Sequence, residues 1–229
     1  GVGCDGIILI QPSQLTDFRM RVYNPDGGEV EMCGNGARCV ARLAHEIGAA
    51  PGTMTFDTVA GPIRAEVRGA RVLLRLTRPK DWVADETLEL EDQRLPFRAV
   101  DSGVPHVVVV VDDLEQTDVQ AMGAGIRYHE RFAPAGTNAN FVQVTGPDSL
   151  RIRTYERGVE HETLACGTGM VAAALVSARA ERVSAPVHVT CASGDVIDVD
   201  FRLTEDGAED VTMLGPTVHV FEGVLEYGA

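Results

Sequence analysis

Short apolar or alternating runs, many of them separated by Gly, Pro or Asp, dominate the hydrophobic pattern of the chain. Alternation with a period of two predicts strands that bury one face, and the intervening Gly, Pro and Asp residues predict turns. The expected strands are 7–10, 18–23, 53–59, 63–67, 72–76, 107–111, 140–144, 150–155, 187–191, 196–201 and 218–225. The pattern therefore predicts a protein that is mostly sheet.

Two segments follow a helical pattern instead. In residues 35–47 the apolar positions recur with the spacing of one helix face, and Gly48 follows as a stop signal. In residues 168–182 the stretch from Met170 to Ala178 is nearly all small and apolar, which predicts a helix buried on most sides. A weaker helical pattern covers residues 114–124.

The two strong helices begin with similar sequences. Cys33-Gly34-Asn35-Gly36 opens the first, and Cys166-Gly167-Thr168-Gly169 opens the second, 133 residues later. This period is far too long for a solenoid repeat, so it indicates two similar halves. We expect an α/β (α+β) fold of two pseudo-symmetric halves, each a curved, mostly antiparallel sheet wrapped around a buried central helix, with a cleft between them. The N-terminal half would comprise 1–78 with a returning strand from 217–229, and the C-terminal half 79–216.

Charge excludes several function classes. The 229 residues include 34 acidic and 20 basic side chains, for a formal net charge of −14. Such a surface repels phosphate backbones and anionic lipids, which argues against nucleic-acid and membrane-surface binding. No apolar run reaches the roughly 18 residues of a membrane helix. The single lysine, Lys80, lies in a polar segment expected to be a loop, a poor context for the Schiff-base lysine that pyridoxal phosphate requires.

The chain has five cysteines, an odd number, and it has no secretory signal pattern. We therefore expect free thiols in a reducing cytoplasm. A cysteine before a glycine-rich helix start sits where partial positive charge and free N–H groups accumulate, which favours the thiolate. The same N–H groups suit a bound carboxylate. Two such turns that face each other predict a thiolate that removes a proton from carbon and a thiol that returns one to the opposite face, without a cofactor.

Plainer interpretations compete with this one. A cysteine before a glycine-rich turn is more often a small buried hydrophobe than a catalyst. Zinc binding is not indicated, because the Cys33 and Cys39 spacing is Cys-x₅-Cys with no following His pair. The remaining cysteines lack a glycine turn and are expected to be structural: Cys4, Cys39 and Cys191.

Two long motifs resemble those of diaminopimelate epimerases. The first is NPDGGEVEMCGNGARC at 24–39, and the second is YERG at 155–158 followed by ETLACGTG at 162–169. Similar runs occur at 105–112, 136–142 and 215–221, so the resemblance covers nearly the whole chain. It implies a cofactor-independent epimerase that converts LL-2,6-diaminopimelate to the meso isomer in lysine and peptidoglycan precursor synthesis. It also implies a homodimer, with the active site between the two halves.

The resemblance assigns a role to each matching residue. It makes Cys33 and Cys166 the catalytic thiols and His106 and Glu156 the polar groups that tune them. Residues implied to contact the substrate are Asn24, Gly34, Asn35, Asn138, Glu156, Arg157, Gly167 and Thr168. The last assignments also make chemical sense, because Arg157 can grip a carboxylate with two N–H groups and Glu156 can accept from an ammonium group. An ordinary solvated ion pair at a strand end is the plainer interpretation of Glu156 and Arg157.

Some features depart from the family pattern. Val104 stands where many members have Asn, Gly6 where some have Gln, and the loop between Glu156 and Cys166 is longer than in some relatives. We also expect that an initial strand is missing, which would leave an incomplete N-terminal sheet. A proline racemase-like isomerase is one alternative, disfavoured by Asn35 and by the run 156–158. A binding or redox protein with an idle thiol pair is the other.

Overall fold

The computed structural model describes residues 6–90 and 93–224. Within these ranges, one sheet path runs in the order β1-β2-β4-β5-β6-β15-β14-β13-β11-β10-β9-β8-β7, with β3 and β12 attached to β2 and β11. The strands are β1 (Ile7–Gln11), β2 (Phe18–Tyr23), β3 (Glu29–Val30), β4 (Thr53–Thr58), β5 (Gly61–Arg68), β6 (Arg71–Arg75), β7 (Lys80–Leu90), β8 (Gln93–Asp101), β9 (Pro105–Val110), β10 (Asn138–Gly146), β11 (Ser149–Glu156), β12 (His161–Thr163), β13 (Val187–Thr190), β14 (Val196–Thr204) and β15 (Gly207–Pro216).

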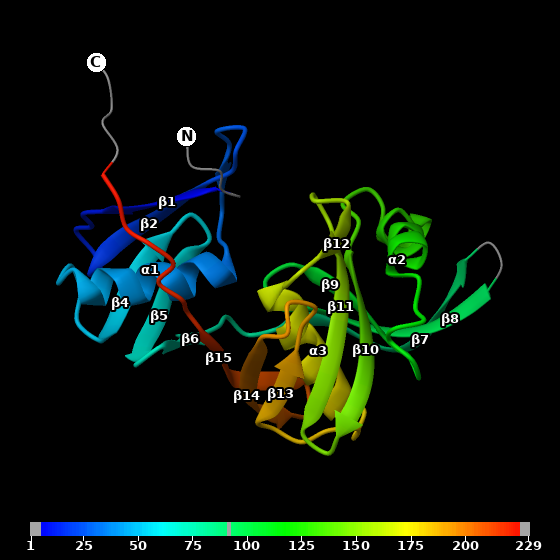
Figure 1. Cartoon of the computed structure of the whole chain (residues 1–229). Coiled ribbons are helices and arrows are strands. Elements are labelled where there is room, and N and C mark those ends of the chain that lie inside the picture. The colour runs from blue at the N-terminus through cyan, green and yellow to red at the C-terminus, as the bar shows by residue number, and fades with distance from the viewer. Residues whose placement is uncertain (1–5, 91–92, 225–229) are drawn as a thin grey trace.

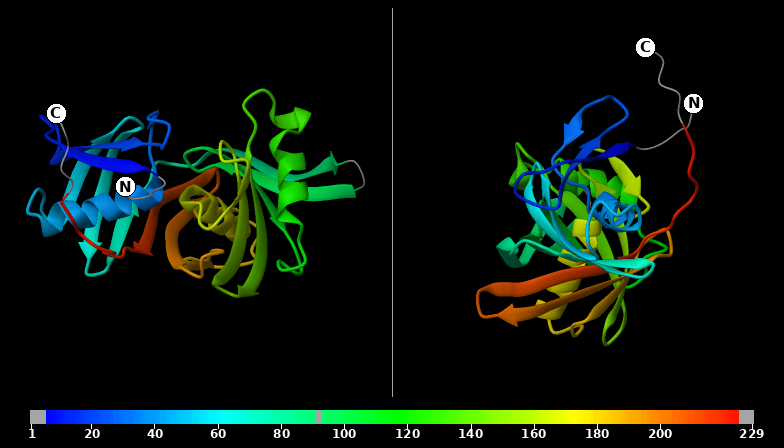
Figure 2. Two further views of the ribbon diagram at one scale, coloured as in Figure 1. Left: turned by 45° about the horizontal axis from the view of Figure 1, so that its top comes forward. Right: turned by 90° about the vertical axis from the view of Figure 1, so that its left-hand side faces the viewer.

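The helices are α1 (Gly34–Glu46), α2 (Val119–Arg127) and α3 (Gly167–Arg179), with a short 3₁₀ helix at Glu130–Phe132. The two long helices, α1 and α3, occupy the concave sides of the sheet, whereas α2 packs on the opposite face of β10 and β11. Figure 1 shows α1 beside β4, β5 and β6 in one part of the molecule, and α3 inside the curve of β9 to β14 in the other. The left view of Figure 2 shows the same two parts side by side. The pairing of β6 with β15 joins the parts into one sheet.

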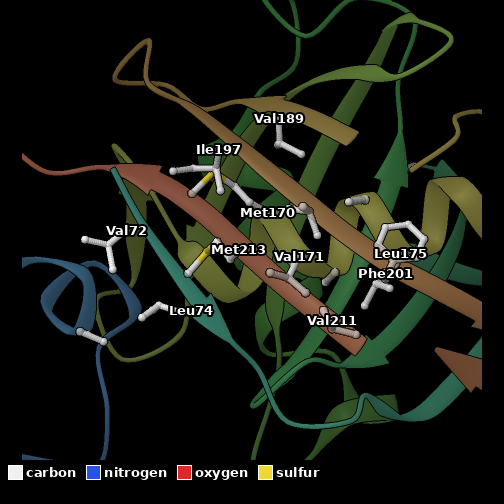
Figure 3. Close-up of a cluster of buried hydrophobic side chains, with 14 of the residues drawn as sticks. Val72, Leu74, Met170, Val171, Leu175, Val189, Ile197, Phe201, Val211 and Met213 are labelled. Atoms are coloured by element: carbon white, nitrogen blue, oxygen red, sulfur yellow. The ribbon is translucent and has the colours of Figure 1, made fainter. Parts of the chain in front are cut away.

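Burial explains where the two long helices lie. On α1 one face is buried, while α3 is buried at every position from Gly169 to Ala178. Met170, Val171 and Leu175 of α3 pack among Ile197 and Val211 of the surrounding strands (Figure 3). The core cluster is continuous from β2 through α1 and α3 to β15. The expected fold class, with two central helices in a mostly antiparallel sheet, is confirmed.

Several sequence expectations are wrong in detail. Segment 218–224 forms no strand, and its apolar residues Val218, Val220 and Phe221 are exposed. The weak helix begins later than expected, at Val119, because the carboxylate of Asp118 caps it by accepting from the N–H of Ala121 at 2.9 Å. Residue 225 lies outside the described residues.

Three long strands were not expected: β7, β8 and β15. Lys80 begins β7 instead of lying in a loop, and its ammonium group lies 3.8 Å from Asp101. The β7 sequence carries few apolar residues, and of its eleven only Leu88 is buried. In β15 a bulge against β14 shifts the register, so that the inward residues Ala208, Val211 and Met213 do not alternate regularly. Sparse burial hides β7 and the bulge hides β15 from a pattern with a period of two, whereas β8 keeps that period at Leu95, Phe97 and Ala99.

Candidate active site

Cys33 immediately precedes α1 and caps it. Its backbone is extended (φ −133°, ψ 117°), and its sulfur accepts the N–H of Gly36 at 3.4 Å. A Cβ on Gly36 would lie 2.6 Å from the terminal methyl group of Ile8, so a larger residue there would have to displace that side chain. The thiol is half-buried, so a ligand can reach a sulfur that already faces the positive end of a helix.

Cys166 holds the equivalent place before α3, with a similar extended backbone (φ −119°, ψ 106°). Its environment is different, because the residue is only 7% exposed and its sulfur lies 3.7 Å from the hydroxyl of Thr168. Burial, and secondly the negative charge of Glu156, raise the pKa of Cys166 to about 12. The sequence-based expectation that the helix start favours the thiolate is therefore wrong for Cys166 in this state: burial outweighs the helix end, and the thiol is the resting form.

The two helix starts lie close together in space. A Cβ built on Gly34 would lie 3.4 Å from the terminal methyl group of Met213, and one built on Gly167 would lie 3.6 Å from the same atom. The position at Gly167 is also 3.8 Å from the side-chain oxygen of Asn35. The fold thus brings two turns that are 133 residues apart in sequence to either side of one methionine.

Free backbone donors collect at this place. In the described part of the chain, the N–H groups of Gly34, Asn35, Gly167 and Thr168 donate no hydrogen bond to protein. Unpaired N–H groups and partial positive charge at two helix ends make a site suited to a carboxylate. A carboxylate held there would place its neighbouring carbon near the two sulfurs.

A buried polar network lies behind Cys166. The Nε2 atom of His106 lies 2.9 Å from the Thr168 hydroxyl, and its Nδ1 atom lies 3.1 Å from the side-chain nitrogen of Asn140. His106 is 1% exposed, and this burial, together with the charge of Arg157, lowers its pKa to about 3. His106 is consequently neutral at physiological pH and can act only through hydrogen bonds.

Glu156 and Arg157 end β11 and start the following turn. One carboxylate oxygen of Glu156 accepts from the Thr163 hydroxyl at 2.9 Å, and burial raises the pKa of this carboxyl group. The guanidinium of Arg157 has only two long contacts, at 3.4 Å, to the carbonyls of Ala135 and Gly136. Within residues 6–90 and 93–224 it has no carboxylate partner, so it can take one from a ligand.

The two asparagines implied to bind substrate lie in different settings. Asn138 is buried, accepts from the N–H of Arg157 at 2.8 Å and donates to the carbonyl of Pro105 at 3.1 Å. It therefore fixes the turn that carries Arg157. Asn24 lies in the exposed turn between β2 and β3, and no contact joins its side chain to the other candidate residues in the part of the chain described.

Other residues of the site were not singled out from the sequence. They are Arg38, Ser102, Asn140, Thr163 and Met213. Ser102, for example, donates to the carbonyl of Thr168 at 2.8 Å and so ties the loop before β9 to α3. Two local signals existed: Arg38 stands inside the first long motif, and Asn140 lies on the same strand face as Asn138.

The remaining cysteines lie elsewhere. Cys39 is exposed on α1, and Cys191 is buried with its sulfur 3.1 Å from the Ser193 hydroxyl. Cys4 lies outside the described residues. In the described ranges, no three His, Cys, Asp or Glu side chains gather closely enough to hold a metal ion. Of the helices in these ranges, none has the length and apolar character needed to cross a membrane.

Comparisons with known proteins agree with the motifs. The family model described as diaminopimelate epimerase matches residues 1–77 and 98–220. A diaminopimelate epimerase of Aquifex aeolicus is 45% identical over 237 residues, which is 99% of this chain and 84% of that protein. One from a Hydrogenobaculum species is 43% identical over 235 residues, 99% of this chain and 82% of that protein.

Solved structures show the same fold at lower identity. A probable proline racemase from Agrobacterium radiobacter matches with a TM-score of 0.72 and 18% identity, over 94% of this chain and 76% of that one. A PhzF family protein from Bacillus anthracis matches with a TM-score of 0.71 and 18% identity, over 97% of this chain and 86% of that one. These two likenesses concern the fold alone.

Proposed function

Because the chain belongs to the diaminopimelate epimerase family and is an isomerase, we propose that it interconverts LL- and meso-2,6-diaminopimelate with Cys33 and Cys166 as its two proton carriers. The step would serve lysine and peptidoglycan precursor synthesis. The observation that supports this proposal most is the approach of the two Cys-Gly-x-Gly helix starts at Met213. One carbon between two thiols can lose a proton on one face and gain a proton on the other.

The proton balance needs one thiolate and one thiol at the start. The thiolate takes the hydrogen of the α-carbon as a proton and becomes a thiol, leaving an electron pair that spreads into the neighbouring carboxylate. The opposite thiol then gives its proton to the other face of that carbon and becomes a thiolate. In the unliganded state Cys166 holds its proton, because burial raises its pKa. Cys166 is therefore suited to return a proton to the carbon when Cys33 acts as the base.

The helix ends supply the stabilisation that this step requires. Abstraction beside a carboxylate doubles the negative charge that its oxygens share. The unpaired N–H groups of Gly34 and Asn35 on α1, and of Gly167 and Thr168 on α3, provide fixed donors for that charge. Because they belong to two packed helices, they need little rearrangement when the charge develops.

The distal end of the substrate needs a second set of partners. Arg157, which has no carboxylate partner among the described residues, would bind the distal carboxylate, and Glu156 would offer a carboxylate for an ammonium group. Asn138 orients the Arg157 turn, and Asn24 would approach the substrate from the β2–β3 turn. His106 and Glu156 would adjust the proton affinity of Cys166, the first by hydrogen bonding through Thr168 and the second by charge.

The same proposal includes a cellular location, an oligomeric state and a division of the chain into two halves. The thiol pair must stay reduced, which favours the cytoplasm. The family resemblance favours a homodimer, which analytical ultracentrifugation would test. We also retain the division into 1–78 with 217–229 and 79–216, because β6 and β15 form the seam between the two parts.

Deuterium wash-in tests the proposed function directly. The protein is incubated in D₂O with LL-diaminopimelate, and NMR follows the α-hydrogen together with the appearance of the meso isomer. We expect deuterium at the inverted carbon, first in the product and later in the recovered substrate. A ligand-binding or redox protein would leave the α-hydrogen in place. Exchange with proline but not with diaminopimelate would favour the proline racemase-like alternative.

A further inference from the structure

The surroundings of the two cysteines differ, although both cysteines stand in a Cys-Gly-x-Gly motif. On α1, Gly36 lies three residues after Cys33 and faces the apolar side chains of Ile8 and Met20. Its counterpart on α3, Gly169, faces a buried amide, and a Cβ there would lie 2.4 Å from the side-chain oxygen of Asn140. A polar group is therefore packed against the start of α3 only, directly behind Cys166.

The surroundings of Asn140 fix which way its amide points. Asn140 is fully buried, and its side-chain nitrogen lies 2.8 Å from the carbonyl of Val107. A carbonyl oxygen can only accept, so the group facing it must be the NH₂ donor. The amide oxygen on the other side accepts from the Thr154 hydroxyl at 3.0 Å. The carbonyl of Val107 on β9 therefore fixes the orientation of the amide, and the Thr154 hydroxyl on β11 adds a bond that agrees with it.

This orientation dictates where the proton of His106 resides. The second N–H of the Asn140 amide points to Nδ1 of His106 at 3.1 Å, so Nδ1 must accept. A neutral imidazole carries one N–H, which is then on Nε2. Nε2 lies 2.9 Å from the Thr168 hydroxyl and donates to its oxygen. The hydroxyl proton of Thr168 is consequently free to donate to the sulfur of Cys166, 3.7 Å away.

The opposite tautomer would reverse the last two bonds. With the proton on Nδ1, Nε2 would accept the single proton of Thr168, and no hydroxyl proton would face the sulfur. We infer that Asn140 is a positioning residue that fixes the Nε2–H tautomer of His106 and thereby directs the Thr168 hydroxyl proton to the Cys166 thiolate formed during turnover. The chain of donors runs from Asn140 through His106 and Thr168 to Cys166.

The inference rests on the proposed two-thiol function, in which Cys166 alternates between thiol and thiolate. A buried thiolate is costly unless something donates to it, and a hydrogen bond to a charged group is among the stronger ones. On α1 the thiol of Cys33 is half-exposed and accepts from the Gly36 N–H, so it needs no such relay. The asymmetry of the two sites follows from their different burial.

The tautomer can be measured without any assay of activity. The full chain is labelled with ¹⁵N-histidine, and long-range ¹H–¹⁵N correlation spectra report which ring nitrogen carries the proton, with His106 assigned by the signal lost in His106→Gln. We expect a protonated Nε2 and an unprotonated Nδ1. A protonated Nδ1 in the wild-type protein would overturn the inference, whatever the outcome of the deuterium experiment.

Two matched variants separate positioning from mere stability. Asn140→Asp has the same shape and, when ionised, presents only acceptors to His106, so Nδ1 should become protonated at a pH where the carboxylate forms. We expect kcat to fall about tenfold to hundredfold with KM within twofold, as the sulfur loses its donor. Thr154→Val removes the bond to the amide oxygen and leaves both donors in place. It should lower the thermal midpoint while the tautomer and kcat stay unchanged.

The outcomes are distinguishable. If Asn140→Asp changes the tautomer but kcat remains that of the wild type, the relay to Cys166 is wrong. If Thr154→Val reduces kcat as strongly as Asn140→Asp with no change of tautomer, the role of Asn140 is structural and the inference fails. If Asn140→Asp does not fold, two other measurements decide the question: the tautomer of the wild type and the kcat of Thr168→Val. Thr168→Val lacks the hydroxyl and should show the same fall in kcat. Thr168→Ser, which keeps the hydroxyl, should restore most of kcat.

Discussion

The buried guanidinium of Arg38 donates to the side-chain oxygen of Asn35 at 3.1 Å. Arg38 is 6% exposed, its other contacts are the carbonyl of Pro216 at 3.5 Å and the sulfur of Met213 at 3.8 Å, and in the described ranges no carboxylate pairs with it. Burial lowers its pKa, as expected for a charge that lacks a partner. The bond turns the NH₂ group of Asn35 away from Arg38, and the uncompensated charge gives the first helix start a positive potential.

This relationship predicts a variant that loses activity without losing stability. Arg38→Met removes a buried charge and keeps apolar volume, so the free energy of unfolding should rise or change by less than about 1 kcal/mol. The kcat/KM for diaminopimelate should fall at least about tenfold, because Asn35 loses its orientation and the carboxylate site loses positive potential. Urea unfolding and steady-state kinetics measure the two quantities.

A neighbouring arginine provides the control. Arg42 lies one turn later on α1, where it pairs with Glu46 and donates to the carbonyl of Thr217. Arg42→Met should leave kcat/KM unchanged and lower stability slightly. Equal activity of Arg38→Met and wild type would show that Arg38 serves packing alone.

The thiol variants test the proposed chemistry. Cys33→Ala and Cys166→Ala each remove one of two obligatory proton carriers, so kcat should fall by about a thousandfold or more in both directions. Serine replacements should retain only traces, since an alcohol gives up its proton far less readily than a thiol. Cys39→Ala, on the exposed side of α1, should keep full activity, and Cys191→Ala should cost stability alone. Normal turnover of Cys166→Ala would contradict a two-base mechanism.

His106 should make the protein less stable in mild acid. Its pKa falls from 6.5 in the unfolded chain to about 3 in the folded one, so between these values the unfolded state binds the extra proton. Its contribution to stability is therefore complete above about pH 6.5 and is lost as the pH falls, by up to about 1.4 kcal/mol per pH unit. The difference in unfolding free energy between wild type and His106→Gln should narrow accordingly from pH 6.5 to 5.

Chemical denaturation at a series of pH values measures this difference. The exposed His45, near the end of α1, offers a matched variant, because His45→Gln removes a histidine from the surface instead of from the core. A gap between wild type and His106→Gln that stays constant with pH would mean that His106 is not a buried neutral imidazole.

The sequence predicted those parts of the molecule that local pattern specifies. The helices α1 and α3 were expected nearly to their ends, because small apolar residues recur at helical spacing and each helix follows a Cys-Gly-x-Gly turn. The strand β7 was missed because only Leu88 of its eleven residues is buried, whereas β8 was missed although Leu95, Phe97 and Ala99 alternate in it. The 218–224 segment looked like a strand because it is apolar, but a strand also needs a partner.

The same distinction applies to the candidate site. Cys33 and Cys166 were identified because both stand in a repeated local motif. Met213 and Arg38 meet across 175 residues of chain, and Asn140 meets His106 across 34, so no local pattern could pair them. The high pKa of Cys166 was likewise hidden, because a motif shows the helix start but not how deeply the sulfur is buried.

Oxidation should join the two candidate thiols. If one carbon fits between the sulfurs of Cys33 and Cys166, closure of the unoccupied site allows mild oxidant to form a disulfide, with loss of activity that a reductant reverses. Peptide mapping by mass spectrometry identifies the bridge. Cys39→Ala should be inactivated at the wild-type rate. A dominant Cys33–Cys39 bridge would contradict the proposed geometry.

Recognition of two charged ends predicts strong substrate selectivity. Arg157 lacks a carboxylate partner in the described part of the chain, so its guanidinium can pair with the distal carboxylate of diaminopimelate. Lysine has no distal carboxylate and would leave this guanidinium unpaired, so its kcat/KM should be lower by about a thousandfold or more. Arg157→Lys should also be damaging, because an ammonium cannot reproduce the planar contact through two N–H groups. Arg151→Lys, on the exposed face of β11, should retain wild-type kinetics. Steady-state kinetics with both amino acids test this, and a wild-type protein that racemised lysine as fast as it epimerised diaminopimelate would remove Arg157 from the distal site.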